Sequence, residues 1–252
     1  MRKIVFIFIL AAILASGCAV SRKTGSNVRP LLSRDGGTIL ELANNQNITN
    51  SSFFIEKGRI STTGESGRIR LLFTMKYKQP GIYLISLKSI TGTEAFRVYL
   101  TRDTVLINDR INKITYAGKP FDFERITGLP AALLKLSVGD FFSQKEKEKK
   151  VMECVESKLI VEDYYQGLKI ESIMDCGIGK TKKVTIASGL PNELISILYS
   201  KHDNDFYKIP GKVELNDFRR NVKIVIKIEK KSVPWNGDIE FVPGREYIRK
   251  RL

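Results

Sequence analysis

The stretch that decides the fold of this sequence is Arg68-Ile69-Arg70-Leu71-Leu72-Phe73-Thr74-Met75-Lys76-Tyr77-Lys78. Every odd position of the stretch carries an apolar side chain, and most even positions carry polar or charged ones. Successive side chains of a strand point to opposite faces of a sheet, so this alternation predicts a strand with one buried and one solvated face. Such one-sided burial is typical of antiparallel sheets.

The region after this stretch repeats the strand pattern at short intervals. Turn-forming residues follow at Gln79-Pro80-Gly81, and polar turns recur at Arg102-Asp103 and Asn108–Asn112. Between the turns the sequence predicts short strands at Ile82–Leu87, Phe96–Leu100, Thr104–Ile107 and Lys113–Ala117. Successive short strands joined by polar turns predict an antiparallel meander.

Helical periodicity replaces the strand pattern after Lys119. Four apolar residues follow the i, i+3, i+4, i+7 spacing of one helix face: Leu129, Ala132, Leu133 and Leu136. We therefore expect an apolar helix, opened by Pro130 and buried against the sheet. The charged residues Gln144–Lys150 either extend this helix or form a second, solvated one, and a short helix is expected earlier, at Thr38–Asn45.

Strand patterns resume beyond Gly167. They predict strands at Leu168–Met174, Lys183–Ala187, Leu194–Ser200, Lys212–Asn216 and Val222–Glu229. In total we expect about ten strands with helices inserted midway. The predicted fold class is mainly β (α+β), with a curved antiparallel sheet that is apolar inside and basic outside.

The N-terminus has the order of a secretory signal. Arg2 and Lys3 precede the apolar run Ile4–Leu14, and small residues follow it. A membrane-spanning helix needs about 20 apolar residues, so this run is too short to span a bilayer. We therefore expect residues 1–17 to be a removable signal peptide.

Cys18 follows the small residues Ala15, Ser16 and Gly17 directly. This ending is typical of a lipoprotein signal, in which the cysteine thiol takes a diacylglycerol before cleavage. The alternative is a plain secretory signal with an incidental cysteine. We expect lipid attachment at Cys18, a flexible tether over residues 18–35, and a single folded domain over residues 36–252.

The chain is strongly basic, with a formal net charge of +15. Loss of Arg2 and Lys3 with the signal would leave +13. A lipid-tethered chain meets anionic headgroups, so we interpret the charge as facing a membrane and expect no nucleic-acid partner.

Two cysteines remain after Cys18, and they lie at equal distances from Tyr165. A hairpin that turns at Tyr165 would place Cys154 opposite Cys176, and an envelope protein lives where disulfides form. A helix over Ser143–Lys158 would instead prevent this pairing. The sequence leaves both alternatives open.

No residue pattern points to catalysis. The segment Gly177–Thr181 resembles the end of a phosphate-binding loop, but Met174 stands where that motif needs a glycine. His202, the only histidine, lies beside Asp203 and Asp205 in a segment of loop composition, without a matched nucleophile. Without a Cys-x-x-Cys motif, metal binding is not expected either. We predict no enzyme activity, no cofactor and no metal site.

Several stretches, in their order and spacing, resemble the family of LolA and LolB, which carry and receive lipoproteins across the Gram-negative periplasm, and especially an uncharacterised bacterial family of LolB-like lipoproteins. They are Ser89–Val98, Lys113–Tyr116, Ile126–Pro130 with the helix that closes near Gly139, and Pro210–Leu215 before the last long strand. The resemblance extends from about Ile48 to Pro243. It implies an incomplete antiparallel β-barrel whose concave face is covered by helices.

The resemblance also implies two kinds of site. An apolar cavity would accept acyl chains, with Leu71, Phe73, Phe96, Val98 and Leu133 as candidate lining residues, although the same side chains would simply be core if the helix fills the concavity. A membrane-contact loop would lie at Ile90, Thr91 and Gly92. The family presents a leucine in this loop where Thr91 stands here, and Ile90 is the substitute.

The leading hypothesis is an outer-membrane lipoprotein on the periplasmic face that binds acyl chains of lipoproteins or lipids during their transfer. Its expected partners are the membrane, through the lipid on Cys18, the acylated cargo, and a periplasmic carrier protein. The residues after Cys18, Ala19 and Val20, include no aspartate of the kind that retains lipoproteins in the inner membrane. The alternative is a non-catalytic envelope scaffold that uses the fold without a ligand.

Overall fold

The computed structural model describes residues 35–65, 67–127, 130–143, 153–188 and 193–252. All of them belong to one compact unit that spans residues 33–252. The predicted signal peptide, Cys18 and nearly all of the predicted tether lie outside the described residues, as does the charged segment Gln144–Lys150. No helix in the described part of the chain is long and apolar enough to cross a membrane.

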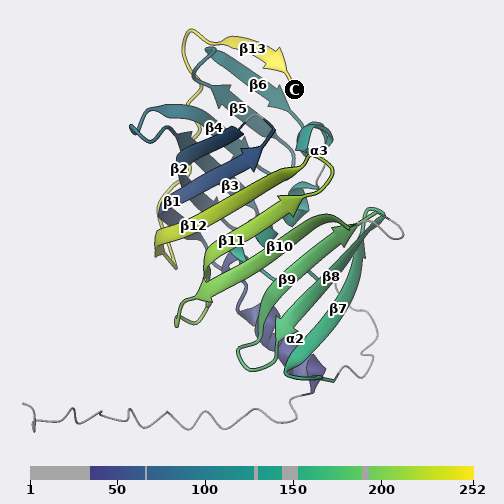
Figure 1. Ribbon diagram of the computed structural model, residues 1–252. Helices are drawn as coiled ribbons and strands as arrows, with labels where there is room; N and C mark the ends of the chain where they lie inside the picture. The colour runs from purple at the N-terminus through teal and green to yellow at the C-terminus, as the bar shows by residue number, and fades with distance from the viewer. Residues whose placement is uncertain (1–34, 66, 128–129, 144–152, 189–192) are drawn as a thin grey trace, which may run out of the picture. The chain divides into compact units, whose positions relative to one another are not determined.

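The described strands form one sheet of thirteen strands (Figure 1). They are β1 (Phe53–Gly64), β2 (Gly67–Lys78), β3 (Ile82–Lys88), β4 (Glu94–Leu100), β5 (Val105–Asp109), β6 (Ile114–Gly118), β7 (Lys158–Tyr165), β8 (Leu168–Asp175), β9 (Lys180–Ala187), β10 (Glu193–His202), β11 (Pro210–Asp217), β12 (Val222–Ser232) and β13 (Ile248–Arg251). The described pairings are antiparallel, except that β13 joins β6 in parallel. The predicted mainly β fold is confirmed.

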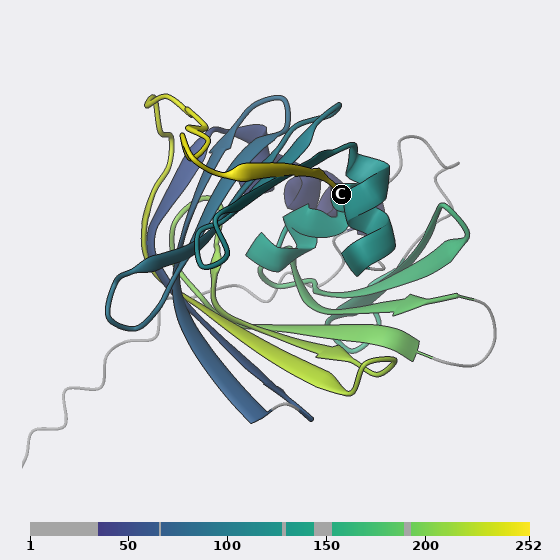
Figure 2. The same cartoon turned by 90° about the horizontal axis from the view of Figure 1, so that it is seen from above.

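The strand order is β13-β6-β5-β4-β3-β2-β1-β12-β11-β10-β9-β8-β7. Two meanders, β1 to β6 and β7 to β12, therefore meet where β1 pairs with β12. The sheet stays open, because β7 and β13 are its two edges. Figure 2 shows it curving around the short helices, which lie on its concave side. This arrangement is the predicted incomplete barrel.

The structure contains three strands that the sequence does not predict: β1, β7 and β13. In β1 the alternation is broken by a register shift between Ile55 and Gly58, so that both residues face the core although they are three positions apart. Gly58 is required there, because a Cβ atom would lie 2.1 Å from the ring of Phe73. β13 carries four exposed residues and has no buried face to create a pattern.

In the described ranges, four helical segments accompany the sheet: α2 (Gly36–Asn45), η1 (Ile48–Asn50), α3 (Pro120–Thr127) and η2 (Ala131–Val138). α2 confirms the helix expected at Thr38–Asn45. The apolar helix is present, but it is the 3₁₀ helix η2, which begins after Pro130 and ends at Gly139 in the left-handed region, φ 85°. A side chain at Gly139 would meet Pro210 at 2.6 Å. The eight-residue helix α3 is too short to give a periodic signal and was not predicted.

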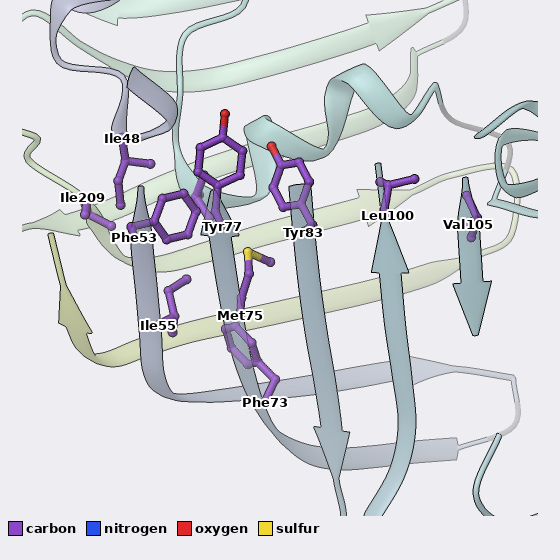
Figure 3. Packing of buried hydrophobic residues seen from close by; sticks show 11 residues of the cluster. Ile48, Phe53, Ile55, Phe73, Met75, Tyr77, Tyr83, Leu100, Val105 and Ile209 are labelled. Carbon is purple, nitrogen blue, oxygen red and sulfur yellow. The ribbon is translucent and has the colours of Figure 1, made fainter. Parts of the chain in front are cut away.

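Three clusters of buried side chains lie between the sheet and the helices. The first lies mainly under β1 to β5, where side chains of neighbouring strands point to the same side (Figure 3): Phe53, Ile55, Phe73, Met75, Tyr77, Tyr83, Leu100 and Val105. The second joins η2 to β8 through β11, and the third joins α2 to β7 and β8.

After β12 the chain crosses the outer face of the sheet on its way to β13. We call residues 233–247 the C-terminal strap. Its Trp235 packs on Phe54 with ring centroids 5.6 Å apart, and its Phe241 packs on Tyr99 at 5.7 Å. Asn108 donates a hydrogen bond to the Val242 carbonyl at 3.0 Å. The strap thus covers part of the convex surface.

Candidate functional site

The inward face of β7 through β10 is closed off from solvent. Most of its inward side chains are buried, from Leu159 and Val161 on β7 to Ile195 and Ile197 on β10, and only those near the β7–β8 turn, Tyr165 and Leu168, are partly buried. The covering groups are α2 and η2, whose apolar residues belong to the same clusters. We call this region the sealed half; it is packed core.

A second inward surface, formed by β12 and β1 to β5, is apolar but only partly covered. Its residues are partly exposed and include Ile69, which is 53% exposed. The register makes them neighbours, because Ile60 of β1 lies opposite both Leu71 of β2 and Ile226 of β12. We call this surface the open concave patch; its members are Ile60, Ile69, Leu71, Leu87, Phe96, Val98, Ile107, Ile224 and Ile226.

A pocket of about 760 Å³ lies between the sheet and the helices at the opposite end of these strands. Tyr77, Tyr83 and Leu100 line it from the sheet, and Ala131 and Lys135 line it from η2. Its volume is in the range of small-molecule sites, and tyrosine and alkyl side chains give it an amphipathic wall. We call it the η2 pocket.

The electrostatics of the η2 pocket follow from burial. Burial, with a smaller contribution from Asp140, raises the pKa of Tyr77 to about 12. Burial lowers the pKa of Lys135, although Asp140 and Asp163 oppose this shift. The Lys135 ammonium lies 4.7 Å from the ring centroid of Phe142, and among the described residues it has no ion-pair partner. The pocket therefore combines the neutral Tyr77 with charged side chains, the cations Lys135 and Arg102 and the carboxylates Asp103 and Glu124.

A buried polar network holds η2 against the segment that follows α2. Asp140 accepts hydrogen bonds from the backbone of Ile48 at 2.7 Å and Thr49 at 3.1 Å, and from the Thr49 hydroxyl at 2.6 Å. The Asn47 amide exchanges two hydrogen bonds with the backbone of Phe141, at 2.9 and 2.7 Å. Buried polar groups must be satisfied in this way, so the network fixes where η2 lies.

The sequence-predicted lining residues fall into two groups. Leu71, Phe96 and Val98 belong to the open concave patch. Phe73 and Leu133 are only 3% and 4% exposed and lie within the first and second clusters. The reason is packing, because the Phe73 ring fills the space over a glycine and η2 inserts Leu133 against the sheet. These two are core residues in this structure.

The loop predicted to contact a membrane is the turn between β3 and β4. Ile90 is 72% exposed, and Thr91 and Gly92 are exposed beside it. The Gly92 N–H donates to the Ser89 carbonyl at 2.9 Å, and Gly92 has a φ of 90°, which favours glycine. The turn therefore holds Ile90 out into solvent.

The structure joins Cys154 to Cys176 in a disulfide. Between them β7 and β8 form the hairpin that turns after Tyr165. Of the two alternatives left open by the sequence, the structure has the hairpin.

The glycine-rich segment at Gly177–Thr181 is a structural turn. The Asp175 carboxylate accepts hydrogen bonds from the N–H groups of Gly177 at 2.7 Å and Ile178 at 3.3 Å. Lys180 is buried and donates to the Gln46 carbonyl at 2.8 Å, so it links β9 to the end of α2. Within the described residues, no three His, Cys, Asp or Glu side chains form a group that could hold a metal ion.

Sequence reasoning did not single out Lys135 or Asp140. A signal for Lys135 was present, because it is the one charge in an otherwise apolar helix (Ala131–Val138). Asp140 follows the helix-ending Gly139, but nothing in the sequence shows that its partners lie 91 and 92 positions away.

The fold is similar to that of several solved structures, although no family model and no curated protein matches the sequence. A LolA superfamily protein from Nitrosomonas europaea has a TM-score of 0.55 and 13% identity, over 82% of this chain and 96% of that one. A DUF1329 family protein from Desulfovibrio piger has a TM-score of 0.52 and 11% identity, over 78% and 91%. An outer membrane lipoprotein-sorting protein domain from Vibrio parahaemolyticus has a TM-score of 0.50 and 8% identity, over 77% and 91%. At these identities the comparison shows the fold, which is LolA-like as predicted.

Proposed function

From this LolA-like fold and its open concave patch, we propose that the protein is a non-catalytic, lipid-anchored lipoprotein of the bacterial outer membrane. It binds acyl chains of lipoproteins or lipids on its concave face and takes part in their transfer or in envelope biogenesis. The lipid on Cys18 tethers it to the periplasmic face of the membrane, and a periplasmic carrier protein delivers its cargo. The observation that carries the proposal is the apolar, partly exposed inward surface of β12 and β1 to β5.

The size of the open concave patch suits an acyl chain. The patch crosses from β12 through β1, β2, β3 and β4 to β5, which is five strand spacings of about 4.8 Å, or about 24 Å. One leaflet of a bilayer has a hydrocarbon thickness of about 15 Å, half of the ~30 Å core. A chain laid across the patch would gain about 0.8 kcal/mol for each methylene that it buries. An acyl chain on the patch would also remove its partly exposed apolar side chains from water, which favours binding.

The turn at Ile90 supports the membrane half of the proposal. A large apolar side chain held into solvent by a tight turn is suited to insert at a bilayer surface. Thr91 cannot supply the apolar contact that the resemblance assigns to this loop, so Ile90 supplies it. The η2 pocket is a second place where part of a ligand fits, with Lys135 available to an anionic group.

Native mass spectrometry of residues 33–252, purified from a bacterial periplasm, tests the proposal. We expect a lipid or acylated peptide to be retained, or bound after addition of a palmitoylated peptide or phospholipid. Leu71→Asp should remove the adduct, because Leu71 faces the concave side. Leu84→Asp is the matched control: this leucine of the neighbouring strand β3 faces outward, lies opposite the outward Lys76, and its adduct should persist.

Circular dichroism of both variants must match that of the parent chain for the comparison to count as a binding effect. A chain without any adduct, before and after addition of both probes, would overturn acyl binding and favour the scaffold alternative. Equal loss in both variants would also contradict the assignment to the concave face.

A further inference from the structure

A cationic groove lies on the outer face of the sheet, opposite the open concave patch. Its volume is about 450 Å³, and it is lined mainly by residues of β12, β1 and β2 with outward side chains, together with Ile60 and Leu71, whose side chains belong to the concave face. Its cations are Arg59, Arg68, Arg70 and Lys227, and its apolar lining includes Leu72, Val225 and the exposed Ile90. The groove therefore joins the candidate membrane-contact turn to a set of positive charges.

The charges of the groove are not balanced within the described residues. Arg59 lies directly opposite Lys227 in the β1–β12 ladder, and like charges in this position are destabilising. Glu229 pairs with Arg59 and, at 3.4 Å, with Lys57. No carboxylate in the described ranges pairs with the other three cations. These three cations are therefore available to an external anion.

The chemistry of the groove suits a phosphate. Arginine presents a planar fork of N–H donors that matches phosphate oxygens, and three of the four cations are arginines. Neighbouring strands lie about 4.8 Å apart, so side chains from β12, β1 and β2 can reach one phosphate group. Cations that flank an exposed apolar side chain favour a lipid surface over a soluble polyanion.

We propose that this groove binds the phosphate headgroup of an anionic phospholipid in a bilayer while Ile90 enters the headgroup boundary. The site gives the membrane contact a preference for anionic lipid. It lies on the opposite face from the open concave patch and does not depend on acyl binding there.

Binding of residues 33–252 to vesicles tests the proposal, with phosphatidylcholine alone and with added phosphatidylglycerol. We expect stronger partition onto the anionic vesicles, decreasing as salt is added. The double variant Arg68→Gln/Arg70→Gln should partition about 25-fold more weakly, about fivefold for each charge removed near the surface. Ile90→Ser should weaken partition onto both kinds of vesicle.

The matched control is Arg249→Gln/Arg251→Gln on β13, which removes two exposed charges elsewhere. It should change partition by less than about threefold. An equal loss in both double variants would overturn the proposal in favour of general charge attraction. Displacement from vesicles by soluble glycerol phosphate would assign the groove to a soluble anion and overturn the bilayer source. Tighter binding to a single-stranded oligonucleotide than to anionic vesicles would overturn it as well.

Discussion

β8 and β2 have the same alternating pattern but differ in what covers them. On β8 the inward Ile170 and Met174 are completely buried. On β2 the exposed fraction of the inward residues increases toward the N-terminal end of the strand, from 3% at Phe73 to 53% at Ile69. An alternating strand thus becomes core where a helix covers it and a candidate binding surface where none does. The difference between the sealed half and the open concave patch is a difference in cover.

The cover of the sealed half is held by polar contacts between distant parts of the chain. Asp140 and Asn47 tie the end of η2 to the segment after α2, and Lys180 ties β9 to the same segment. The two clusters that contain η2 and α2 do not include Ile69 or Leu71. Three predictions examine the contrast, in order of decreasing effect.

Asp140→Ala should destabilise the sealed half most. It leaves the buried N–H groups of Ile48 and Thr49 and the Thr49 hydroxyl without their acceptor, and each unsatisfied group costs about 1 to 3 kcal/mol. We expect the free energy of unfolding in urea to fall by about 3 to 5 kcal/mol. Asp140→Asn keeps one acceptor oxygen and should lose less. A loss below about 1 kcal/mol for the alanine variant would show that the network does not hold the cover.

Removing equivalent inward side chains should separate the two regions directly. Ile186→Ala on β9 leaves a cavity in packed core and should cost about 2 to 5 kcal/mol. Leu71→Ala in the open concave patch removes a partly exposed side chain and should cost about 1 kcal/mol or less. Urea unfolding of both variants gives the comparison. Equal losses would mean that the patch is core and not a binding surface.

The pH dependence of stability should show the burial of Lys180. Burial lowers the pKa of Lys180 to about 8, although Asp140 opposes the shift, whereas an unfolded lysine titrates near about 10.4. Between these values the unfolded chain holds a proton that the folded chain has released, so the free energy of unfolding should rise as pH increases. The slope is at most about 1.4 kcal/mol per pH unit. The added stability is lost as pH falls through about 8, because Lys180 is then protonated in both the folded and the unfolded chain.

Lys180→Met is the reference for this measurement, because it keeps the apolar stem and has no titrating group. The rise should be present in the parent chain and reduced in the variant. Tyr77, with its pKa raised to about 12, acts in the opposite direction above about pH 10, so the difference between the two curves is compared there. Parallel curves throughout would contradict the assignment.

Most of the sheet could be predicted because alternation is a local property of the chain. The pattern over Arg68–Lys78 becomes β2, and the later patterns become strands in the expected order. β1 was not predicted because a register shift interrupts the alternation of its apolar residues. β13 was not predicted because it has no buried face. The 3₁₀ geometry of η2 was likewise not readable, since the spacing of apolar residues does not differ clearly between short helix types.

The candidate site could be predicted only in part. The sequence places Leu71, Phe96 and Val98 on the apolar side of their strands, but Phe73 and Leu133 have the same apolar character, so the sequence does not separate surface from core. The cationic groove required the register, because Arg59 and Lys227 are 168 positions apart (227 minus 59) and meet only where β1 pairs with β12. The sequence shows that the chain is basic, and the pairing shows where the charge is concentrated.

By itself the sequence determined the position of most strands, which side of each of these is apolar, and where the apolar helix lies, because these features depend on spacing along the chain. Tertiary structure alone decided which apolar faces are covered, which cations lie together and which polar groups hold η2. Cover depends on contacts between segments that are distant in the chain, such as Asp140 with Thr49, 91 positions away. No local pattern encodes such a contact. An alternating strand becomes core where these contacts hold a helix over it, and it stays open to a ligand where they do not.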